Sequence, residues 1–491
     1  MQIIIILYIT LTPFILKNTF NKITSLLAKN GFPLPKHIQP LPSSGSDRQY
    51  FRVLVNSGTM DSLIAAYNPD IKENKAWYSF SKHFRSQGLS VPEIIAHDDS
   101  FTYFLLEDLG NTSLFNLLAE GFNEEAAGYY KKVIRDLIKF QVEGIKGLDL
   151  NVAYPVKSFD RKSIMWDLNY FKYYFVKPNG VLFDESKLED DFEAFADHLL
   201  RAETGYFMYR DFQARNIMIY DNKPWYIDFQ GGREGPLQYD LVSLLSQARA
   251  QLSEKTKTEL KSFYLTELEK LIPGKKATFN KYYNSFVYFR LMQVLGAYGF
   301  RGKLQRKAHF LISTGFAVDN LVRLLKTTPP DIDLPELVSV FRQISAAHQL
   351  KQQTNQRKHK LTVRINSFSY IRSGIPEDPT LNGGGFVFDC RALPNPGRIA
   401  DLKDFSGLQE PVIKYLESSS EIKEYLEHVF NLVDQSITNY NQRGFEHLQV
   451  NFGCTGGKHR SVYCAEKLAG HLKKYKNKVS IIINHLMTDS W

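Results

Sequence analysis

Cysteine is scarce in this sequence. Only three occur among 491 residues, Cys390, Cys454 and Cys464, and all of them lie in the last quarter of the chain. A disulfide scaffold requires several paired cysteines and an oxidising compartment. The composition therefore argues against such a scaffold and predicts a cytoplasmic protein with reduced thiols.

Apolar runs long enough to cross a membrane are also lacking. The run at residues 3–16, IIIILYITLTPFIL, is too short for an ordinary membrane span. No basic residue precedes it and no clear small-residue cleavage site follows it, which argues against a secretion signal. We interpret residues 1–19 as a buried or misassigned apolar leader, and a membrane anchor is the alternative.

The excess of one charge sign is small. The formal net charge is +9, from 61 basic and 52 acidic residues. This balance suits anionic ligands such as nucleotides, sugar phosphates or RNA, but it does not establish nucleic-acid binding, and no DNA partner is expected. With 43% hydrophobic residues, a chain of this length can bury substantial cores and should contain more than one domain.

The most informative segment runs from Tyr209 to Gln230, YRDFQARNIMIYDNKPWYIDFQ. Its two apolar runs around a turn predict a hairpin that brings Asn216 and Asp228 side by side. These two residues can hold Mg²⁺ on a nucleoside triphosphate, while Asp211 can orient and deprotonate an acceptor hydroxyl. The alternative is an ordinary hairpin with solvated carboxylates. The three residues together, with Asp240 at the start of the next helical run, favour phosphoryl transfer.

This spacing resembles the aminoglycoside phosphotransferase and sugar kinase branch of the protein-kinase-like fold. In that branch a catalytic Asp lies five residues before an Asn, and a metal-binding Asp follows, as here. Tyr209 replaces the usual His of the motif, and Gln230 replaces the usual Gly after Phe229. The resemblance implies an α+β bilobal kinase domain over residues 20–330 that uses ATP and Mg²⁺.

One lysine that is typical of this fold is missing. The strand-like segment 62–67, SLIAAY, has no lysine to bind the α and β phosphates. With the segment YFR that precedes it, this absence resembles the bacterial kinases that phosphorylate N-acetylmuramate and N-acetylglucosamine at the anomeric hydroxyl. An amino sugar is therefore the expected acceptor. Unless the domain has lost its activity, the candidates to replace the lysine are Arg48, Arg52, Lys72 and Lys75.

Two other segments are candidates for nucleotide binding. The small residues Ser44, Gly45 and Ser46 would let backbone N–H groups approach phosphates, and Arg48 would add charge. The segment FLLEDLG resembles the hinge between kinase lobes, where the backbone near Glu107 and Leu109 would meet the adenine. Each has a plain alternative, a common Ser/Gly turn or a core strand with an acidic end. An aromatic helix at 166–175 is interpreted as core more readily than as a lining of the acceptor pocket.

A domain boundary is expected near residues 327–330, because two prolines interrupt the helical pattern there. Residues 331–362 are then predicted to form a helix and a linker whose basic run, KQQTNQRKHK, is solvated. From residue 363 to residue 491, strands alternate with helices. This alternation predicts an α/β layered domain with a largely parallel sheet.

The centre of that domain is a glycine-rich loop between a strand and a helix, GCTGGKHRS. Such a loop directs backbone N–H groups and the positive end of the helix at an anion. The spacing of the cysteine and the arginine also matches Cys-dependent phosphatases, although no general acid can be assigned. A P-loop does not fit, because the loop is one residue short. The candidate anion ligands are Cys454, Thr455, Gly456, Gly457, Lys458, His459, Arg460 and Ser461.

Residues 363–491 resemble the C-terminal domain of the RNase adaptor (RapZ-like) family. The segments that carry the resemblance are INSFSYIRSGIP, FVFDCRALPNP, FSGLQEPV and NFGCTGGKHRSV, in the family's order. The resemblance implies a domain that senses glucosamine-6-phosphate and in some members binds a small RNA, and it adds Arg391 and Asn395 to the phosphate pocket. The family's own P-loop domain is replaced here, and Leu486 stands where a basic residue is usual. We therefore expect sugar-phosphate binding rather than RNA-adaptor activity.

The whole sequence thus predicts a cytoplasmic two-domain protein. An ATP- and Mg²⁺-dependent amino-sugar kinase is joined to a domain that senses a hexosamine phosphate. One alternative is a non-catalytic regulatory protein that binds a nucleotide or RNA, which the missing strand lysine suggests. The other is a kinase fused to a Cys-dependent phosphatase.

Overall fold

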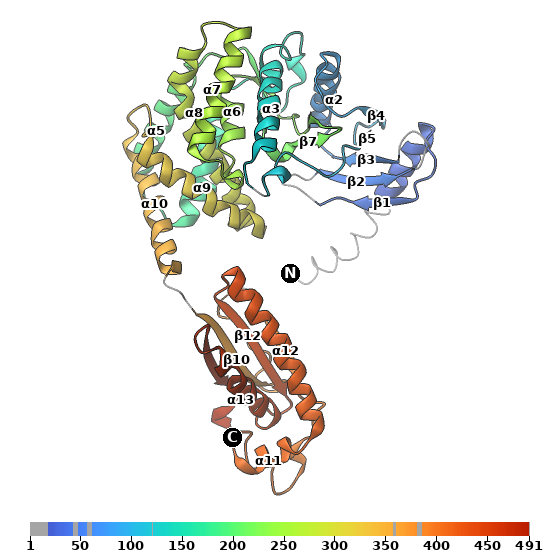
Figure 1. Cartoon of the computed structure of the whole chain (residues 1–491), viewed down its shortest axis with the longest axis vertical. Coiled ribbons are helices and arrows are strands. Elements are labelled where there is room, and N and C mark those ends of the chain that lie inside the picture. The colour runs from blue at the N-terminus through green and yellow to red at the C-terminus, as the bar shows by residue number, and fades with distance from the viewer. Residues whose placement is uncertain are drawn as a thin grey trace. The chain divides into compact units, whose positions relative to one another are not determined.

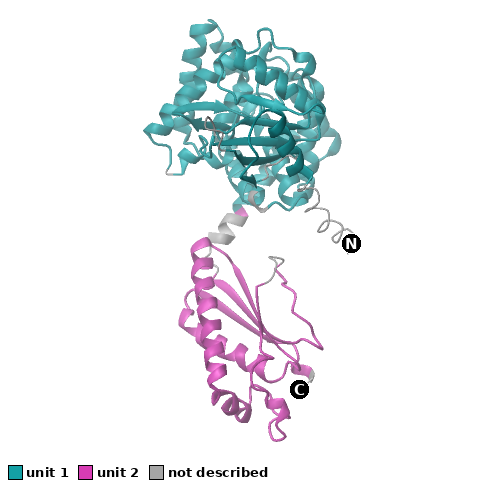
Figure 2. Cartoon of the chain, turned by 90° about the vertical axis from the view of Figure 1, so that its right-hand side faces the viewer, with its two compact units in different colours: residues 1–349 teal, residues 350–491 magenta. Residues whose placement is uncertain are grey.

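The computed structural model describes residues 18–42, 48–55, 61–119, 121–356, 360–380 and 385–490. Contacts divide the chain into two compact units, residues 1–349 and residues 350–491 (Figure 2). Residues 1–17 of the predicted leader and the predicted phosphate loop with Ser44, Gly45 and Ser46 lie outside the described residues. Each unit is described separately below.

The first unit begins with a small sheet lobe (Figure 1). Its five strands lie in the order β1-β2-β3-β5-β4, and every neighbouring pair is antiparallel. Because side chains alternate along a strand, Phe51 and Val53 share a core with a helix at 18–29, whereas Tyr50 and Arg52 face the other side. The strands are β1 (His37–Pro40), β2 (Gln49–Leu54), β3 (Ser62–Tyr67), β4 (Ile94–His97) and β5 (Tyr103–Glu107).

Helix α2 (Ile71–Ser86) covers that other side of the sheet. It begins at Asp70, whose carboxylate accepts hydrogen bonds from the backbone N–H groups of Lys72 and Glu73. Trp77 and Phe80 of its buried stripe belong to the large core of the first unit. The capped start places Glu73 in the first turn of the helix.

A helical lobe follows the sheet lobe. The segment between α5 and α6 forms two small antiparallel pairs, β6 with β9 and the hairpin β7–β8. Helix α8 has buried residues on nearly all of its sides, among them Phe286, Phe289 and Leu295. It therefore forms the centre of the lobe. The helices are α3 (Glu124–Val142), α4 (Arg161–Phe171), α5 (Glu185–Leu199), α6 (Gln238–Leu245), α7 (Glu254–Leu271), α8 (Lys276–Gly299) and α9 (Ala308–Thr327). The strands are β6 (Tyr206–Met208), β7 (Ile217–Tyr220), β8 (Lys223–Tyr226) and β9 (Arg233–Gly235).

The helical lobe extends past the two prolines at residues 329 and 330. Helix α9 ends at Thr327, and α10 (Pro335–Gln356) follows. Leu337, Val340 and Phe341 of α10 are buried in the core of the first unit. Residues 331–349 therefore pack as part of this unit, and the change from one unit to the next lies inside α10 rather than before it.

The second unit is built on four strands in the order β11-β12-β10-β13, all parallel to their neighbours. Strands β10 and β12 lie at the centre, and α11, α12 and α13 share its core. This arrangement confirms the predicted α/β domain with a parallel sheet. Its elements are β10 (Leu361–Ser369), β11 (Phe386–Asp389), β12 (His447–Cys454), β13 (Val479–His485), α11 (Glu410–Glu417), α12 (Ser420–Arg443) and α13 (Arg460–Leu472).

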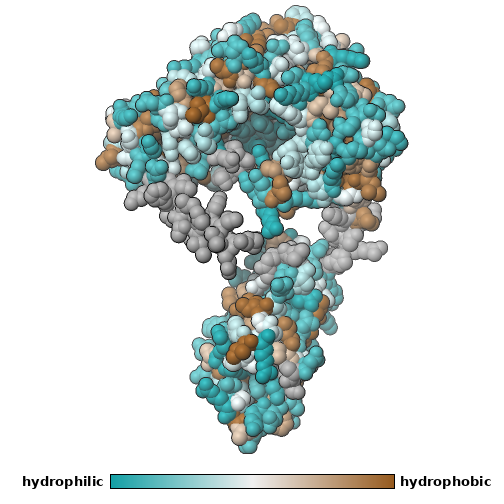
Figure 3. Space-filling model, turned by 180° about the vertical axis from the view of Figure 1, so that it is seen from behind, coloured by the Kyte–Doolittle hydropathy of each residue, from teal (hydrophilic) through white to brown (hydrophobic). Residues whose placement is uncertain are grey.

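On the face that Figure 3 draws, hydrophobic residues lie in small groups among hydrophilic ones. Within the described ranges, none of the helices has both the length and the apolar character that a membrane span requires.

Candidate active site and candidate anion-binding loop

The hairpin β7–β8 brings the three predicted site residues together. Asn216 immediately precedes β7, and Asp228 lies two residues beyond β8. The Nδ2 of Asn216 donates hydrogen bonds to the backbone oxygen of Asp211, at 2.9 Å, and to Oδ2 of Asp228, at 3.0 Å. One amide side chain therefore sets the positions of both carboxylate-bearing residues.

The backbone is strained at two residues of this site. Arg210 has a φ of 81° and Asp228 a φ of 71°, a left-handed conformation that non-glycine residues rarely adopt. The carboxylate of Asp240, on α6, accepts the N–H of Tyr209 at 2.7 Å and the N–H of Arg210 at 2.9 Å. The guanidinium of Arg210 in turn donates to both oxygens of Asp167. These bonds hold the strained turn that precedes Asp211.

Asp240 is fully buried. Burial raises the pKa of this carboxyl to about 7, although the backbone N–H groups of Tyr209 and Arg210 favour its charged form. The pKa of an exposed aspartate is about 4. The protonation state of Asp240 thus couples the folding of the turn to pH.

Asp211 lies in a ring of arginines. Its position inside the protein raises its pKa, but Arg290, Arg215, Arg210 and Arg301 together outweigh this effect and lower the pKa below its usual value. Nη2 of Arg290 lies 3.5 Å from Oδ1 of Asp211, and Nε2 of Gln213 donates to the same oxygen at 3.2 Å. Asp211 is therefore a carboxylate at neutral pH, which is the form that can accept a proton from a hydroxyl group.

Two cavities meet at Asp228. The first, of about 300 Å³, lies between the sheet lobe and the hairpin, and the predicted hinge residues Glu107 and Leu109 line it. The second, of about 400 Å³, contains Asp211 together with Arg215, Arg290 and Arg301. The linings share Tyr50, Ile227 and Asp228. A ligand in the first cavity can therefore reach the metal-binding candidate that also faces Asp211.

The donor set fits a magnesium ion that is shared with phosphates. Asp228 offers a carboxylate and Asn216 an amide oxygen, the hard oxygen ligands that Mg²⁺ prefers. In the described part of the chain no cluster of three or more His, Cys, Asp or Glu side chains could hold a metal by itself. Two protein oxygens suit an ion whose other ligands are water and a nucleotide.

The structure distinguishes the four cations that could replace the missing strand lysine. Arg52 is bound to Asp108 through Nε at 2.6 Å and Nη2 at 3.0 Å, so it fastens β2 to the hinge. Lys72 and Lys75 are exposed on α2. Arg48 is buried, and its Nη2 lies 3.6 Å from Oε1 of Glu73 on α2.

Arg48 has the environment of a phosphate ligand. Burial lowers its pKa, but Tyr50, Glu73 and Asp228 more than offset this and raise it, so the side chain is charged. Its Nη2 is buried and makes no hydrogen bond to the described residues. Protein kinases pair their strand lysine with a helix glutamate in the same way. Arg48, the residue before β2, and Glu73 of α2 form an ion pair of the same kind.

The aromatic segment at 166–175 packs into the core on one side, whereas Trp166 and Tyr173 are about half exposed. Phe171 and Phe175 are buried in the core of the first unit, and Asp167 binds Arg210. The lining of the cavity around Asp211 includes no residue of this segment among those that the structure describes. Instead, α8 and the turn that follows it contribute much of that lining.

Three polar residues that line the cavity around Asp211 were not predicted from the sequence. Arg290 and Gln293 lie on α8, and Arg301 lies in the turn after it. No motif marks them, because they are about 80 residues away from Asp211 along the chain. A lone arginine on an otherwise buried aromatic helix was the only available signal.

The candidate anion-binding loop connects β12 to α13 in the second unit. Ligands of parallel sheets bind at the carboxyl ends of the strands, and there the loop meets the ends of β10 and β11. Ser369 donates to the backbone oxygen of Thr455 at 2.6 Å, and Gly457 has a φ of 68°. A side chain at Gly457 would meet Ser369 and Met487. Thr455 and Gly456 form the exposed part of the loop.

Several predicted ligands of this loop are engaged in holding it. Arg460 is buried, and its Nη1 donates to the backbone oxygens of Arg391 and Leu393. Lys458 donates to the backbone oxygen of Asp404 at 2.8 Å. Asn395 caps a short turn by accepting the N–H of Gly397. The candidates therefore do converge on one region, but these three stabilise its backbone.

The remaining candidates divide into buried and exposed groups. Cys454 is only 2% exposed, and its Sγ lies 3.1 Å from Oγ of the fully buried Ser461. A nucleophilic cysteine must be accessible and activated, so this environment argues against a Cys-dependent phosphatase. Arg391 is exposed, pairs with Asp389 and lies over the ring of Tyr370. Burial lowers the pKa of His459, whose Nε2 has no described hydrogen-bond partner.

We predict that Asp240→Asn changes the pH dependence of stability. In the folded protein the carboxyl binds a proton more tightly than in the unfolded chain, so between about pH 4 and about pH 7 the native state holds more protons. The stability that this proton provides is lost as the pH rises through that window. Relative to the variant, the unfolding free energy of the native chain should therefore fall from pH 4 to 7, as measured by chemical denaturation at several pH values. A constant difference would mean that Asp240 is ionised throughout.

Comparison with known proteins agrees with the two-part architecture. Residues 37–272 match the phosphotransferase enzyme family, and residues 361–487 match the RapZ C-terminal domain. A nucleotide-binding protein of Glaesserella parasuis serovar 5 is 32% identical over 181 residues, which cover 36% of this chain and 61% of that protein. Another, of Clostridium acetobutylicum, is 41% identical over 130 residues, 26% of this chain and 42% of that protein. The chain thus spans about half the length of these curated relatives.

Solved structures resemble the first unit. A choline/ethanolamine kinase family protein from Mesorhizobium loti aligns with 67% of this chain and 99% of its own, at 12% identity and a TM-score of 0.44. Amicoumacin kinase hAmiN, solved with AMP-PNP and Ca²⁺, aligns with 65% of this chain and 96% of its own, at 12% identity and a TM-score of 0.46. The two matched segments, residues 37–272 and residues 361–487, lie one in each of the two compact units.

Proposed function

We propose that the first unit is an ATP-dependent kinase that phosphorylates a hydroxyl group of an amino sugar. The observation that supports this most strongly is the meeting of two cavities at Asp228, with Asp211 in one and the hinge residues in the other. Such a layout lets a nucleotide and an acceptor lie in line across one metal-binding position. Phosphoryl transfer requires this positioning more than covalent chemistry.

In this proposal the nucleotide occupies the cavity beside Glu107 and Leu109. Asn216 and Asp228 would hold Mg²⁺, which neutralises charge on the transferred phosphoryl group when it is bound. The buried guanidinium of Arg48, fixed by Glu73, takes the place of the missing strand lysine at the phosphates. The absence of that lysine therefore does not by itself require a pseudokinase.

Asp211 is proposed as the general base. Arg290 and the neighbouring arginines keep it ionised, so it accepts a hydrogen bond from the acceptor hydroxyl. It takes the proton of that hydroxyl as the new P–O bond forms and the bond between the γ-phosphorus and the leaving ADP breaks. The strained turn at Arg210 aims this carboxylate into the cavity. A low pKa makes Asp211 a weak base in the ground state, which suits a transition state in which the proton leaves late.

We propose that the second unit binds a hexosamine phosphate at the loop 454–461, the product class of amino-sugar kinases. The exposed backbone at Thr455 and Gly456, next to the start of α13, supports an anion site. A cytoplasmic location and Mg²⁺ as the metal are parts of the same proposal. The burial of Cys454 makes a phosphatase the weaker candidate.

Asp211→Asn should reduce kcat about 10²- to 10⁴-fold, because general-base catalysis typically contributes this much. The affinity for ATP should change little, because Asp211 lies outside the hinge cavity. Steady-state kinetics with an amino sugar and calorimetry with ATP measure both. Asp221→Asn, an exposed substitution on the turn of the same hairpin, is the matched control. If both variants turn over alike, Asp211 is not the base.

Arg48→Met should raise the KM for ATP about tenfold or more, because a charged hydrogen bond to a phosphate is lost. Arg48→Lys should restore part of the affinity. Lys75→Met, on the exposed side of α2, is the control and should leave the KM for ATP unchanged. Circular dichroism establishes that the variants are folded. An unaltered KM for ATP in folded Arg48→Met would remove this residue from the phosphate site.

Gly456→Asp should weaken binding of glucosamine 6-phosphate to the full chain about tenfold or more, because a carboxylate would face the anion. A side chain at this position meets nothing within 4 Å, so the fold should tolerate it. The asparagine of Gly456→Asn has nearly the same size as aspartate but no charge. This variant should therefore bind glucosamine 6-phosphate much more tightly than Gly456→Asp does. Calorimetry compares the two. Equal affinity of both variants would place the sugar phosphate elsewhere.

A further inference from the structure

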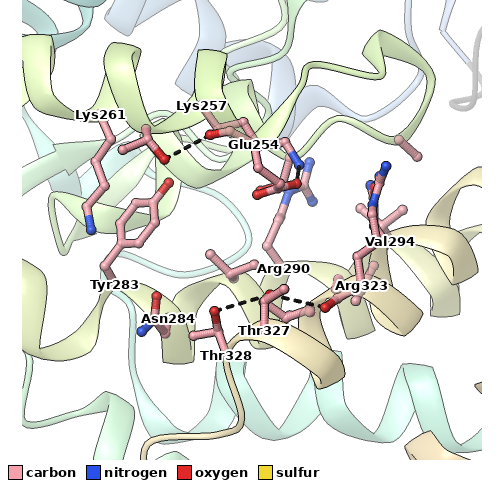
Figure 4. Close-up of a pocket in the computed structure, with 17 residues that line it drawn as sticks. Glu254, Lys257, Lys261, Tyr283, Asn284, Arg290, Val294, Arg323, Thr327 and Thr328 are labelled. Atoms are coloured by element: carbon pink, nitrogen blue, oxygen red, sulfur yellow. Dashed lines mark hydrogen bonds and ion pairs between the residues drawn. The ribbon is translucent and has the colours of Figure 1, made fainter.

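A third cavity, of about 240 Å³, lies inside the helical lobe between α7, α8 and α9 (Figure 4). Its lining contains four cationic side chains, Lys257, Lys261, Arg290 and Arg323, and a single acidic one, Glu254. Glu254 is paired with Lys257 at 2.8 Å. The cavity therefore keeps an excess of positive charge that its own walls do not neutralise.

Lys261 is the most informative residue of this cavity. It is partly buried, and its Nζ lies 4.0 Å from the centre of the ring of Tyr283. No ion pair joins it to a carboxylate in the part of the chain that the structure describes. Burial lowers its pKa. An unpaired, partly buried ammonium group is costly, and a bound anion would remove that cost.

The other polar groups surround a compact space. In Figure 4, Lys261 and Tyr283 lie on one side of the cavity and Arg323 on the opposite side. The hydrogen bond of Arg323 goes to Asn320, a neutral neighbour on α9. Thr258, Asn284 and Thr328 add neutral donors and acceptors, and the lining also contains Val287, Leu291 and Leu324.

The lining defines the chemical class of the ligand. Lysine and arginine together favour a phosphate group, and arginine can bind it with two parallel hydrogen bonds. The neutral amide and hydroxyl groups suit the hydroxyls of a small polar body. The volume lies below the roughly 300–1,000 Å³ of pockets that enclose drug-sized ligands. A ligand of the size of a sugar phosphate fits this space better than a nucleotide does.

We propose that this cavity is a second ligand site of the first unit, which binds a small phosphorylated metabolite through Lys261 and Arg323. It is separate from the two cavities that meet at Asp228, and it does not depend on the proposed kinase activity. Arg290 lines both this cavity and that of Asp211. Its Nε donates to Ser243 at 3.0 Å, and its Nη2 faces Asp211. Val294 also lines both cavities, so Arg290 and Val294 lie between the proposed ligand and the candidate base.

Labelling with pyridoxal 5′-phosphate tests this site in the full chain. Its phosphate would bind in the cavity, its aldehyde would condense with the neutral amine of Lys261 with loss of water, and borohydride would reduce the imine to a stable secondary amine. Peptide mass spectrometry then compares Lys261 with Lys255, an 86% exposed lysine of the same helix. We expect Lys261 to be labelled several times faster, and pyridoxal without the phosphate to lose this preference. Equal labelling of the two lysines with pyridoxal 5′-phosphate would overturn the proposal.

Protection identifies the ligand class. Glucosamine 6-phosphate should protect Lys261 but not Lys255, and at lower concentration than inorganic phosphate. Arg323→Gln should raise about tenfold the concentration of glucosamine 6-phosphate that half-protects Lys261. Lys326→Gln, on the same helix but outside the cavity, should leave that concentration unchanged. Equal effects of the two variants would overturn the assignment of Arg323. If inorganic phosphate protected Lys261 and glucosamine 6-phosphate did not, the proposed metabolite would be wrong and the cavity would be a site for free phosphate.

Discussion

The buried carboxylate of Asp240 is the constraint on which the candidate active site depends. It accepts the backbone N–H groups of Tyr209 and Arg210 and so stabilises a left-handed turn that a non-glycine residue otherwise avoids. That turn decides where Asp211 points. Asp228 is positioned in turn by Asn216, which donates hydrogen bonds to the backbone of Asp211 and to the side chain of Asp228. A single buried acid thus supports the whole candidate site.

The two aspartates of the candidate site, Asp240 and Asp211, have opposite pKa shifts because their surroundings differ. Asp240 is buried against the backbone and has a raised pKa, whereas Asp211 lies among arginines and has a lowered one. Arg48 with Glu73 and Arg210 with Asp167 form two more pairs. Three of the arginines that lower the pKa of Asp211, namely Arg215, Arg290 and Arg301, also give the cavity around Asp211 positive charge. Arg290 belongs to that cavity and to the basic cavity behind it.

Much of the fold could be predicted, because it depends on local patterns. The hairpin around Asn216 and Asp228 follows from two apolar runs and a turn, and the parallel sheet follows from alternating strands and helices. Arg290 and the pair of Arg48 with Glu73 could not be predicted, since they arise from tertiary contacts between distant segments. In the candidate anion-binding loop the residue types suggested anion ligands, but tertiary packing determines which side chains are available for binding. The side chain of Arg460, for example, points inward and donates to backbone oxygens. The extent of the helical lobe was missed because α10 resumes after the prolines.

The central claim is that the first unit transfers phosphate from ATP to an amino sugar despite lacking the strand lysine. The most direct measurement is ATP consumption by the full chain with Mg²⁺ and a panel of amino sugars, compared with neutral sugars and with no acceptor. The account predicts Mg²⁺-dependent ADP formation that requires an amino sugar and produces its phosphate ester. Nucleotide binding without turnover of any amino sugar, or turnover of an unrelated acceptor only, would contradict it.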